Sequence, residues 1–596
     1  MKIRLLSMLQ LLALVLLVNT GLTSCKKFLK IEPLSSFGTD YVFSNVVNAE
    51  KAVIGVYYRL AGDNGYGIRV SMYYPYDDDI MMGQGGTPFP DNERRDIAHY
   101  TVNANNTQLP APFNQFYNGI ERANICIYNI PRMPQYENGT PQEKAALRRL
   151  HGEALTLRAL YYQELIRNWG DVVAQFLPSS METNLFKRRT DRDSIYDVLL
   201  DDLALAATLL PWRTEVPRDE RITQGAARAL RARIALFRGG WSLRQNGTMQ
   251  RGSNHLKYYQ IARDECAAIM ARPDQHRLNP SYESVFRDYV CGKQLDPFGE
   301  IILEVGMGGG NSALGDSKLG YYNGPRVNNN GNSALTVLPN YFYMFDSTDS
   351  RRDVMCAPYF VNATGTTITS RTGRGLEVML DGKFRRDWIP GALTIGPQWF
   401  GVNWPVIRFS DVLLMFAEAE NELNNGPTSA AIAAFEQVRL RAFRGNAALI
   451  GTTPTTYAGF FDAIVRERAL ELGGEGIRKY DLIRWNLLGT KLAETRAILA
   501  AMANRTPPYN QLPEYMLFQT NTLGPNWINS FYAPNPFGTS TPAGHTRVNW
   551  VRQNINTTIL TFYAIGFTPN KSELLPLPQA SLDANPNLTQ NPGYQQ

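Results

Sequence analysis

Residues 144–169 read KAALRRLHGEALTLRALYYQELIRNW and carry a long helical pattern. Apolar side chains return at steps of three and four residues, the spacing that places them on one face of an α-helix. The residues of that face are Leu150, Ala154, Leu157, Tyr161 and Leu165. An apolar stripe of this kind has to be covered by other elements, so the stretch predicts a long helix inside a helical core.

Comparable patterns lie on both sides of this stretch and come in pairs. The other predicted helices of the first set are 48–60, 113–130, 193–210, 223–237 and 257–271. A later set comprises 411–423, 429–443, 457–472 and 477–488. Small residues at facing positions, such as Ala431 four residues before Phe435, allow antiparallel helices to approach closely. The arrangement resembles degenerate tetratricopeptide helix pairs, whose repeat is about 34 residues. We therefore expect a mainly α-helical fold with such pairs as its scaffold.

Two regions interrupt the helical pattern. Residues 62–112 are rich in Gly, Asn, Pro and Tyr, and residues 275–406 combine Gly- and Asn-rich loops with strand-like runs at 300–305 and 377–380. After residue 503 the chain turns to Pro-rich loops. Long irregular segments within a compact domain are usually functional or disordered. The aromatic content of these two regions favours ordered, functional loops.

The first residues resemble an export signal. Lys2 and Arg4 precede an apolar run, residues 5–18, that is too short for a permanent membrane helix, and Cys25 follows the small Ser24. That order resembles the bacterial lipoprotein signal, in which the cysteine is lipidated and becomes the new N-terminus. The alternatives are an ordinary signal peptide or a buried helix with a chance cysteine. Since no later stretch is long and apolar enough to span a membrane, we expect a soluble body on a lipid tether, working outside the cytoplasm.

The composition limits the class of protein. Of the 596 residues, 44% are hydrophobic and 19% are charged, which is ample for a packed core and argues against wholesale disorder. The formal net charge is +6, and removal of Lys2 and Arg4 with the signal leaves +4. This charge is spread without a basic block, so we expect no nucleic-acid partner.

The cysteines give no sign of a metal or redox site. Apart from Cys25 they are scattered and contain no CxxC pair, so neither zinc nor a thioredoxin-like centre is indicated. An exported protein could pair them as disulfides. Cys126 and Cys266 fall within helical patterns, however, and we expect them to be core residues.

Aromatic residues make up 11% of the chain, and one cluster of them stands beside carboxylates. The cluster reads Tyr73-Tyr74-Pro75-Tyr76-Asp77-Asp78-Asp79. A carbohydrate site needs rings that stack on the apolar face of a sugar and acids that accept hydrogen bonds from its hydroxyls. The cluster is therefore a candidate glycan site. Two other interpretations stay open: the rings could pack under a loop, and the acids could bind calcium or be solvated.

Signatures of common enzymes are missing from the sequence. It contains no HExxH, no GxSxG and no P-loop, and Gly306 to Gly310 lack the following helix of a nucleotide site. Glu467 and Glu471 lie one helical turn apart and could be a glycosidase pair. Arginines alternate with these acids, so a lattice of ion pairs that clamps helices is the favoured interpretation. Arg408, beside an apolar run, is expected to clamp a helix start in the same way.

Six segments together resemble the SusD/RagB family of outer-membrane nutrient-binding lipoproteins of Bacteroidetes. They are CKKFLKIEP (25–33), GEALTLRALYYQELIRNWGDV (152–172), RITQGAARALRARIALFRGGW (221–241), NWPVIRFSDVLLMFAEAENEL (403–423), RERALELGGEGIRKYDLIRW (466–485) and LLPLPQASLDANPNLTQNPGY (574–594). Each segment is modest, but six in family order behind a lipoprotein signal are specific. Lys26 and Lys27 depart from the acidic residues that many surface-exported members carry after the cysteine.

The resemblance implies a division of the chain and a SusD-like fold. Residues 1–24 are the signal peptide, 25–45 the tether and leader, 46–274 an N-terminal helical region, 275–406 an irregular insert and 407–596 a C-terminal helical region with a Pro-rich tail. The terminal QNPGY is expected to pack as a tail.

The resemblance also implies a function. The protein would be a non-enzymatic binding protein, lipid-anchored at the outer membrane and facing the exterior. It would capture glycans and pass them to a SusC-like TonB-dependent transporter, with neither a cofactor nor a metal. By position in the family, further ligand contacts would come from Arg94, Asn105, Asn106, Tyr321, Tyr322, Trp399 and Trp404. The alternatives are a surface glycosidase or peptidase that uses dispersed carboxylates, a binder of peptide or another nutrient, and a structural or adhesive surface protein.

Overall fold

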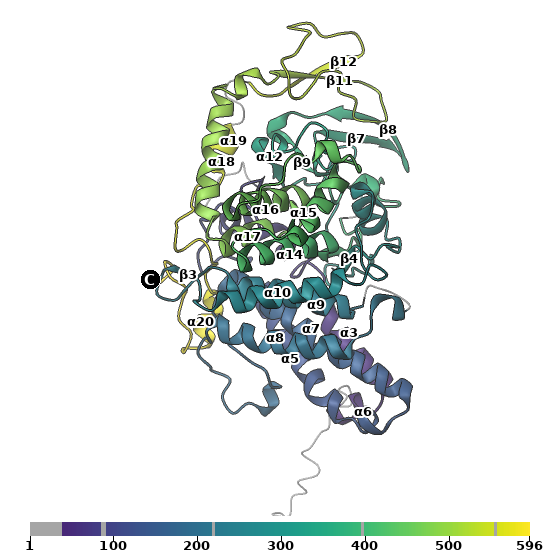
Figure 1. Cartoon of the computed structure of the whole chain (residues 1–596), viewed down its shortest axis with the longest axis vertical. Coiled ribbons are helices and arrows are strands. Elements are labelled where there is room, and N and C mark those ends of the chain that lie inside the picture. Colours follow the sequence, from purple (N-terminus) through teal and green to yellow (C-terminus); the bar gives the residue numbers. More distant parts are fainter. Residues whose placement is uncertain (1–37, 85–90, 217–220, 395–397, 553–556, 596) are drawn as a thin grey trace, which may run out of the picture.

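The computed structural model describes residues 38–84, 91–216, 221–394, 398–552 and 557–595 (Figure 1). The predicted signal peptide, Cys25, Lys26, Lys27 and most of the leader lie outside the described residues. Within them, no helix combines the length and the apolar character needed to cross a membrane.

Residues 144–169 belong to helix α7, Pro141–Trp169. Thr140 caps its first turn, because its hydroxyl accepts from the Glu143 N–H while the Glu143 carboxylate accepts from the Thr140 N–H. Gly170 ends the helix with a φ of 74°, a conformation that residues with a side chain rarely adopt. The predicted apolar face is buried along its whole length.

The other helices of the first set form one stack with α7. They are α3 (Val46–Tyr57), α5 (Pro110–Asn129), α8 (Arg192–Leu209), α9 (Gln224–Gly239) and α10 (His255–Met270), close to the predicted ranges. Each packs against its neighbour in the series (Figure 1). Gly119 of α5 shows why small residues are needed here, since a Cβ on it would lie 2.5 Å from the Tyr161 ring of α7.

The second set continues the stack. Its helices are α14 (Phe409–Leu423), α15 (Ser429–Ala442), α16 (Tyr457–Leu472), α17 (Arg478–Arg484) and α18 (Leu488–Ala503). Helix α10 packs against α14, so one hydrophobic core runs through both sets. Helix α18 was not predicted from the sequence; it runs along one edge of the molecule in Figure 1.

Short strands occupy the two irregular regions and the C-terminal part, and one further pair lies between α9 and α10. β1 (Met81–Met82), β5 (Thr336–Val337), β9 (Leu380–Asp381) and β6 (Cys356–Ala357) form a four-stranded antiparallel sheet in that order. β4 (Ile301–Val305) pairs with β10 (Trp404–Arg408). The antiparallel pairs are β2 (Ser242–Leu243) with β3 (Met249–Gln250), β7 (Tyr359–Thr364) with β8 (Thr367–Gly373), and β11 (Tyr515–Gln519) with β12 (His545–Asn549).

Of the two strands predicted in the second irregular region, one is present and the other is largely absent. The strand predicted at 300–305 is present as β4. The strand predicted at 377–380 is wrong for most of its length, because Leu376–Val378 form a 3₁₀ turn and only Leu380 enters β9. The residues after 503 also include the pair β11–β12, which the Pro-rich composition concealed.

Shorter helical elements complete the chain. They are α2 (Thr39–Val42), α4 (Arg94–Ala98), α6 (Pro134–Asn138), α11 (Tyr282–Ser284), α12 (Pro339–Phe342), α13 (Arg352–Met355), α19 (Thr557–Phe562), α20 (Gln579–Ala584) and the π-helical segments η2 (Arg69–Tyr73) and η6 (Val285–Cys291). The 3₁₀ turns are η1 (Tyr58–Leu60), η3 (Ile130–Arg132), η4 (Ser179–Met181), η5 (Arg213–Glu215), η7 (Leu376–Val378), η8 (Arg386–Trp388), η9 (Ala447–Leu449) and η10 (Tyr509–Gln511).

The predicted lattice of ion pairs lies in the interior between β4 and α16. Arg408, at the start of α14, is fully buried, and its guanidinium lies 2.8 Å from Glu300, 2.9 Å from Glu471 and 2.7 Å from Glu475. Glu467 lies 2.6 Å from Arg351 and is likewise fully buried. The interpretation of these acids as structural is confirmed. Buried and paired in this way, they cannot reach a glycosidic bond.

The cysteines and the C-terminal tail match their expected roles. All four cysteines of the described residues are free and buried, and burial raises the pKa of the Cys126 thiol to about 12. The predicted tail is packed, because the Asn591 amide donates to the carbonyls of Trp169 and Leu575.

Candidate functional site

The tyrosine and aspartate cluster singled out in the sequence lies in the interior. Tyr74 and Tyr76 are each 1% exposed, and Asp77 is fully buried. The Tyr74 hydroxyl donates to the Gln108 carbonyl at 2.8 Å, and the Tyr76 hydroxyl donates to the Gly474 carbonyl at 3.3 Å. The expectation that these rings present a face to a ligand is therefore at odds with the structure.

The carboxylates of the cluster have partners within the chain. Asp77 contacts His99 Nδ1 at 2.8 Å and accepts from the Ala564 N–H at 2.8 Å. Asp78 accepts from two backbone N–H groups, and burial together with the neighbouring Asp79 charge raises its pKa to about 8. Asp79 is bidentate to Arg478. Two of these partners, Ala564 and Arg478, come from distant parts of the chain, which is why the local sequence did not indicate burial. We remove Tyr74, Tyr76, Asp77 and Asp78 from the candidate ligand contacts.

Tyr73, at the edge of the same cluster and 8% exposed, packs against aromatic side chains that are themselves half-buried. Its ring packs edge-on against Tyr322 at 6.4 Å, and Tyr322 packs edge-on against Tyr321 at 5.3 Å. The Arg94 guanidinium lies 5.7 Å from the Tyr73 ring centroid. Tyr321, Tyr322 and Arg94 are half-buried. Burial, followed by the Tyr322 neighbour, raises the pKa of Tyr73, so its hydroxyl stays protonated as a hydrogen-bond donor.

A tryptophan continues this group. The indole N–H of Trp399 donates to Asp63 Oδ1 at 3.0 Å. Lys318 Nζ lies 4.2 Å from the Trp399 ring centroid and 3.5 Å from Asp63 Oδ2. All three side chains are half-buried. The ring is thus held by a carboxylate at its edge and an ammonium near its face.

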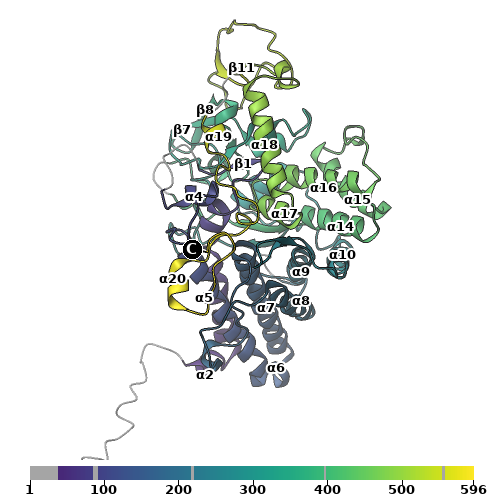
Figure 2. The same cartoon turned by 90° about the vertical axis from the view of Figure 1, so that its left-hand side faces the viewer.

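The two parts are joined through the backbone, because the N–H groups of Tyr321 and Tyr322 donate to the Lys318 carbonyl. Arg69 adds contacts beside Asp63. Its guanidinium donates to the Asp63 carbonyl at 2.9 Å and to Gln108 Oε1 at 3.0 Å. Gln108 in turn donates to Glu93 Oε2 at 2.5 Å. We call the resulting patch the aromatic surface, made of Asp63, Arg69, Tyr73, Arg94, Lys318, Tyr321, Tyr322 and Trp399. Helix α4, which starts at Arg94, lies away from α14–α16 in Figure 2.

The remaining predicted ligand contacts, Asn105, Asn106 and Trp404, differ in their exposure to solvent. Asn105 is exposed, and its side-chain amide has no hydrogen-bond partner among the described residues. Asn106 is only 1% exposed, and its side chain holds the loop together by donating to the Glu93 carbonyl. Trp404 is 2% exposed and stacks on Phe384 at 5.0 Å within the core. The prediction of Trp404 as a surface contact is wrong, because strand β10 turns this side chain inward.

The aromatic surface can bind a polar ligand with flat apolar faces. Rings stack on such faces, while Arg, Lys and carboxylate groups exchange hydrogen bonds with hydroxyls. The described residues contain no group of three or more His, Cys, Asp or Glu placed to hold a metal ion. Asp63, Arg69 and Lys318 were not predicted as ligand contacts. In the sequence, only their position within the irregular regions 62–112 and 275–406 indicated such a role.

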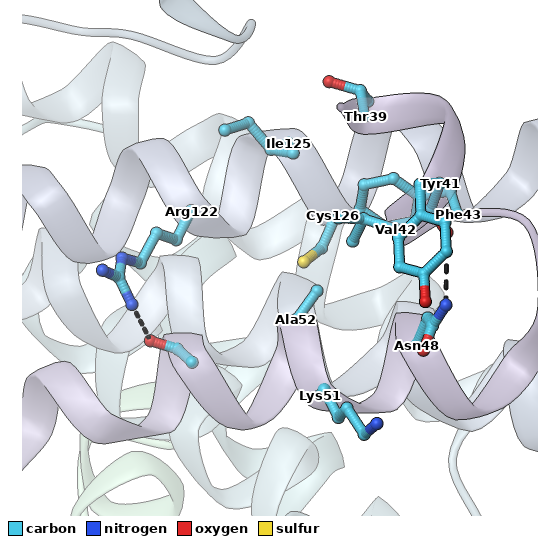
Figure 3. A pocket seen from close by; sticks show the side chains of 11 residues that line it. Thr39, Tyr41, Val42, Phe43, Asn48, Lys51, Ala52, Arg122, Ile125 and Cys126 are labelled. Carbon is cyan, nitrogen blue, oxygen red and sulfur yellow. Dashed lines mark hydrogen bonds between the residues drawn. The ribbon is translucent and has the colours of Figure 1, made fainter. Parts of the chain in front are cut away.

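A separate cavity of about 530 Å³ lies between α2, α3 and α5 (Figure 3). Its wall is mostly apolar and includes Val42, Phe43, Ala52, Ile125 and Cys126. Two polar side chains of its lining are engaged, since Asn48 donates to the Tyr41 carbonyl and Arg122 to the Gly55 carbonyl. None of the predicted ligand residues lines it, and its chemistry does not suit a sugar.

Two sequence-family descriptions match the chain. The SusD family matches residues 359–594, and a family described as starch-binding and associating with the outer membrane matches residues 89–236. Among individual relatives, the SusD-like protein P25 of Formosa agariphila is 26% identical over 512 residues, covering 78% of this chain and 88% of that protein.

Solved structures show the same fold. A SusD homologue from Bacteroides thetaiotaomicron superposes with a TM-score of 0.73 at 21% identity, covering 93% of this chain and 98% of that one. Surface glycan-binding protein A from the same organism, in complex with laminarihexaose, gives a TM-score of 0.60 at 17% identity, covering 91% and 99%.

The fold and the matched segments define a class of proteins built on helix pairs, one of whose family descriptions names starch binding. This chain belongs to the SusD/RagB family.

Proposed function

We propose that this protein captures glycans on the aromatic surface and delivers them to a SusC-like TonB-dependent transporter of the outer membrane. The observation that carries the proposal is the convergence of Tyr73, Tyr321, Tyr322 and Trp399 from distant parts of the chain. These rings stand beside Arg69, Arg94 and the Asp63–Lys318 pair.

The chemistry of this surface favours a hydroxylated ligand. Its charged groups are three bases, Arg69, Arg94 and Lys318, and one acid, Asp63, and contacts within the chain hold Lys318 and Arg69 beside the rings. Sugars present apolar ring faces and many hydroxyls, and they suit such a surface. The complex of a family member with laminarihexaose supports this ligand class.

The anchor and the partner rest on sequence and family. Cys25 in its signal context would carry the lipid, and the family description of outer-membrane association supports that location. A lipid-held binding protein keeps captured glycan close to a transporter in the same membrane. The exterior orientation and the SusC-like partner are part of the proposal.

Affinity electrophoresis of the purified protein tests the proposal. Gels containing laminarin, amylopectin, xylan or mucin should retard the protein with one glycan and without breakdown of that glycan. A paired Tyr322→Ala and Trp399→Ala variant should migrate as in a glycan-free gel. Breakdown of the glycan would instead support the glycosidase alternative, and retardation by none would favour a peptide or another nutrient as ligand.

A further inference from the structure

A second pocket, of about 400 Å³, opens beside the Gly-rich loop after β4. Its lining includes Tyr289, Lys293, Glu304, Met307 and Asn403, together with Gly306 and Gly308 of the loop. We call it the Gly-loop pocket. None of the ligand contacts predicted from the sequence lies in it.

Several polar groups of this pocket have unused hydrogen-bonding capacity. Asn403 is 8% exposed; its Oδ1 accepts from the Met307 N–H at 2.9 Å, which fixes the amide, while its Nδ2 has no partner among the described residues. The half-buried Tyr289 hydroxyl and the exposed Gln294 amide likewise have none within the described part of the chain. These donors face the pocket and are free to bind a ligand that supplies hydroxyls.

The charge of the pocket argues for a neutral ligand. Lys293 and Glu304 carry opposite charges, and Lys293 Nζ donates to the Met307 carbonyl at 2.8 Å. Asp296 is committed to the fold, because its two oxygens accept from the N–H groups of Phe298 and Ile301. Neither an anion nor a cation would find a dominant countercharge here.

The tyrosine of the Gly-loop pocket and one tyrosine of the aromatic surface lie in the same kind of helical segment. Tyr289 lies in the π-helical segment η6, and Tyr73 of the aromatic surface lies in the π-helical segment η2. π-helical turns are rare and occur frequently at functional sites.

Two chain segments join the pocket to the aromatic surface. Trp399 and Asn403 are four residues apart, so their Cα atoms are separated by at most about 14 Å. The adjoining segment bridges them as well, since the Phe400 N–H donates to the Ser317 carbonyl and the Ser317 hydroxyl donates to the Val402 carbonyl. Lys318 of the aromatic surface directly follows Ser317.

We propose that the Gly-loop pocket is a second carbohydrate subsite that holds further sugar units of the glycan bound on the aromatic surface. Tyr289 provides the stacking ring, and the Asn403 and Gln294 amides hydrogen-bond the sugar hydroxyls. The proposal rests on the proposed function. It makes this protein a binder of glycan chains longer than one or two units.

The test compares variants of the full-length protein by affinity electrophoresis in laminarin, amylopectin, xylan and mucin gels. Tyr289→Ala should weaken retardation about 2- to 10-fold, the range expected for one lost aromatic contact. Gln294→Ala, at an exposed position that cannot unfold the protein, should weaken it in the same direction. Tyr128→Ala, a half-buried tyrosine on α5 whose ring contacts Arg132, is the matched control and should not change retardation.

The outcomes separate this proposal from the proposed function. Loss of retardation in Trp399→Ala with none in Tyr289→Ala and Gln294→Ala overturns the second subsite and leaves the aromatic surface standing. The reverse pattern overturns the aromatic surface as the glycan site, and with it the role of the Gly-loop pocket as a second subsite. Absence of retardation of the unaltered protein in every gel overturns both. A crystal soaked with laminarihexaose gives an independent readout, with a sugar ring expected over Tyr289.

Discussion

The Trp399 indole donates a hydrogen bond to the Asp63 carboxylate at 3.0 Å, although 336 positions separate the two residues in the chain. This bond fixes the orientation of a half-exposed ring. A ring that is held in place before the ligand arrives loses little conformational entropy on binding, so we expect it to contribute strongly to affinity.

Replacement of Trp399 should weaken glycan binding. Trp399→Ala removes the largest ring of the aromatic surface and should lower affinity about 10-fold, on the basis of a stacking contact worth about 1.4 kcal/mol. Affinity electrophoresis measures the change. Trp241→Ala, at another half-buried tryptophan just before β2, is the control and should bind normally. Equal losses in both variants would show a general folding defect.

Asp63 should act by positioning Trp399. Asp63→Asn keeps an oxygen that can accept the indole N–H, whereas Asp63→Ala removes it. We therefore expect Asp63→Ala to weaken binding several-fold and Asp63→Asn to stay closer to the unaltered protein. A similar loss in both would mean that the charge facing Lys318 matters more than the hydrogen bond.

Removal of Arg408 should destabilise the fold severely. Arg408→Ala leaves Glu300, Glu471 and Glu475 buried with one partner fewer, and such a change typically costs about 3–5 kcal/mol. Chemical denaturation followed by circular dichroism measures the free energy of unfolding. The exposed pair Lys491–Glu494 provides the contrast, since Lys491→Ala should cost about 0.5 kcal/mol or less.

Acid should destabilise the protein through Asp411. Burial alone would raise the pKa of this carboxyl, but the guanidiniums of Arg468 and Arg233 outweigh burial and lower the pKa to about 2. A carboxyl with a pKa lowered by folding stabilises the native state above its unfolded pKa of about 3.9 and loses that contribution as the pH falls toward 2. The expected loss is about 2 kcal/mol.

Denaturation curves at pH 5, 4, 3 and 2 check this expectation. Asp411→Asn should have a shallower decline than the unaltered protein over the same interval, because the titrating group is gone. An identical decline in both would assign the acid sensitivity to other carboxyls, among which Glu471 also has a pKa lowered by its arginine partners against the effect of burial.

Cys25 should determine attachment to the membrane. Cys25→Ser removes the only thiol available to a lipid at this position, so we expect the variant to leave the membrane fraction of expressing cells. Fractionation with immunodetection measures the distribution. Retention of the variant in the membrane would contradict lipidation at Cys25.

Local sequence pattern was sufficient for the scaffold. The apolar spacing in α7 and α14 marks a helix face wherever the chain goes, because helix formation and burial of one stripe depend on residues only three or four positions apart. The alternation of Arg and Glu around Glu467 likewise indicated ion pairing. No helix was predicted over residues 489–503, which form most of α18, and Pro-rich loops were predicted only after residue 503.

The candidate site could be predicted only in part, because burial is decided between segments far apart. Tyr73 and Tyr74 are neighbours in the same aromatic run, yet one joins the aromatic surface and the other lies beneath Gln108. The local sequence around Asp77 and Asp79 is that of solvated acids. In the structure they are buried, and they accept hydrogen bonds from Ala564 and Arg478.

The sequence by itself determined the helical class and the family, since each depends on patterns within a short stretch. Only the tertiary structure decided which aromatic rings face a ligand. Long-range packing brings Asp63 to Trp399 and Asn403 to Met307, and no local pattern encodes which distant segment will cover a given side chain.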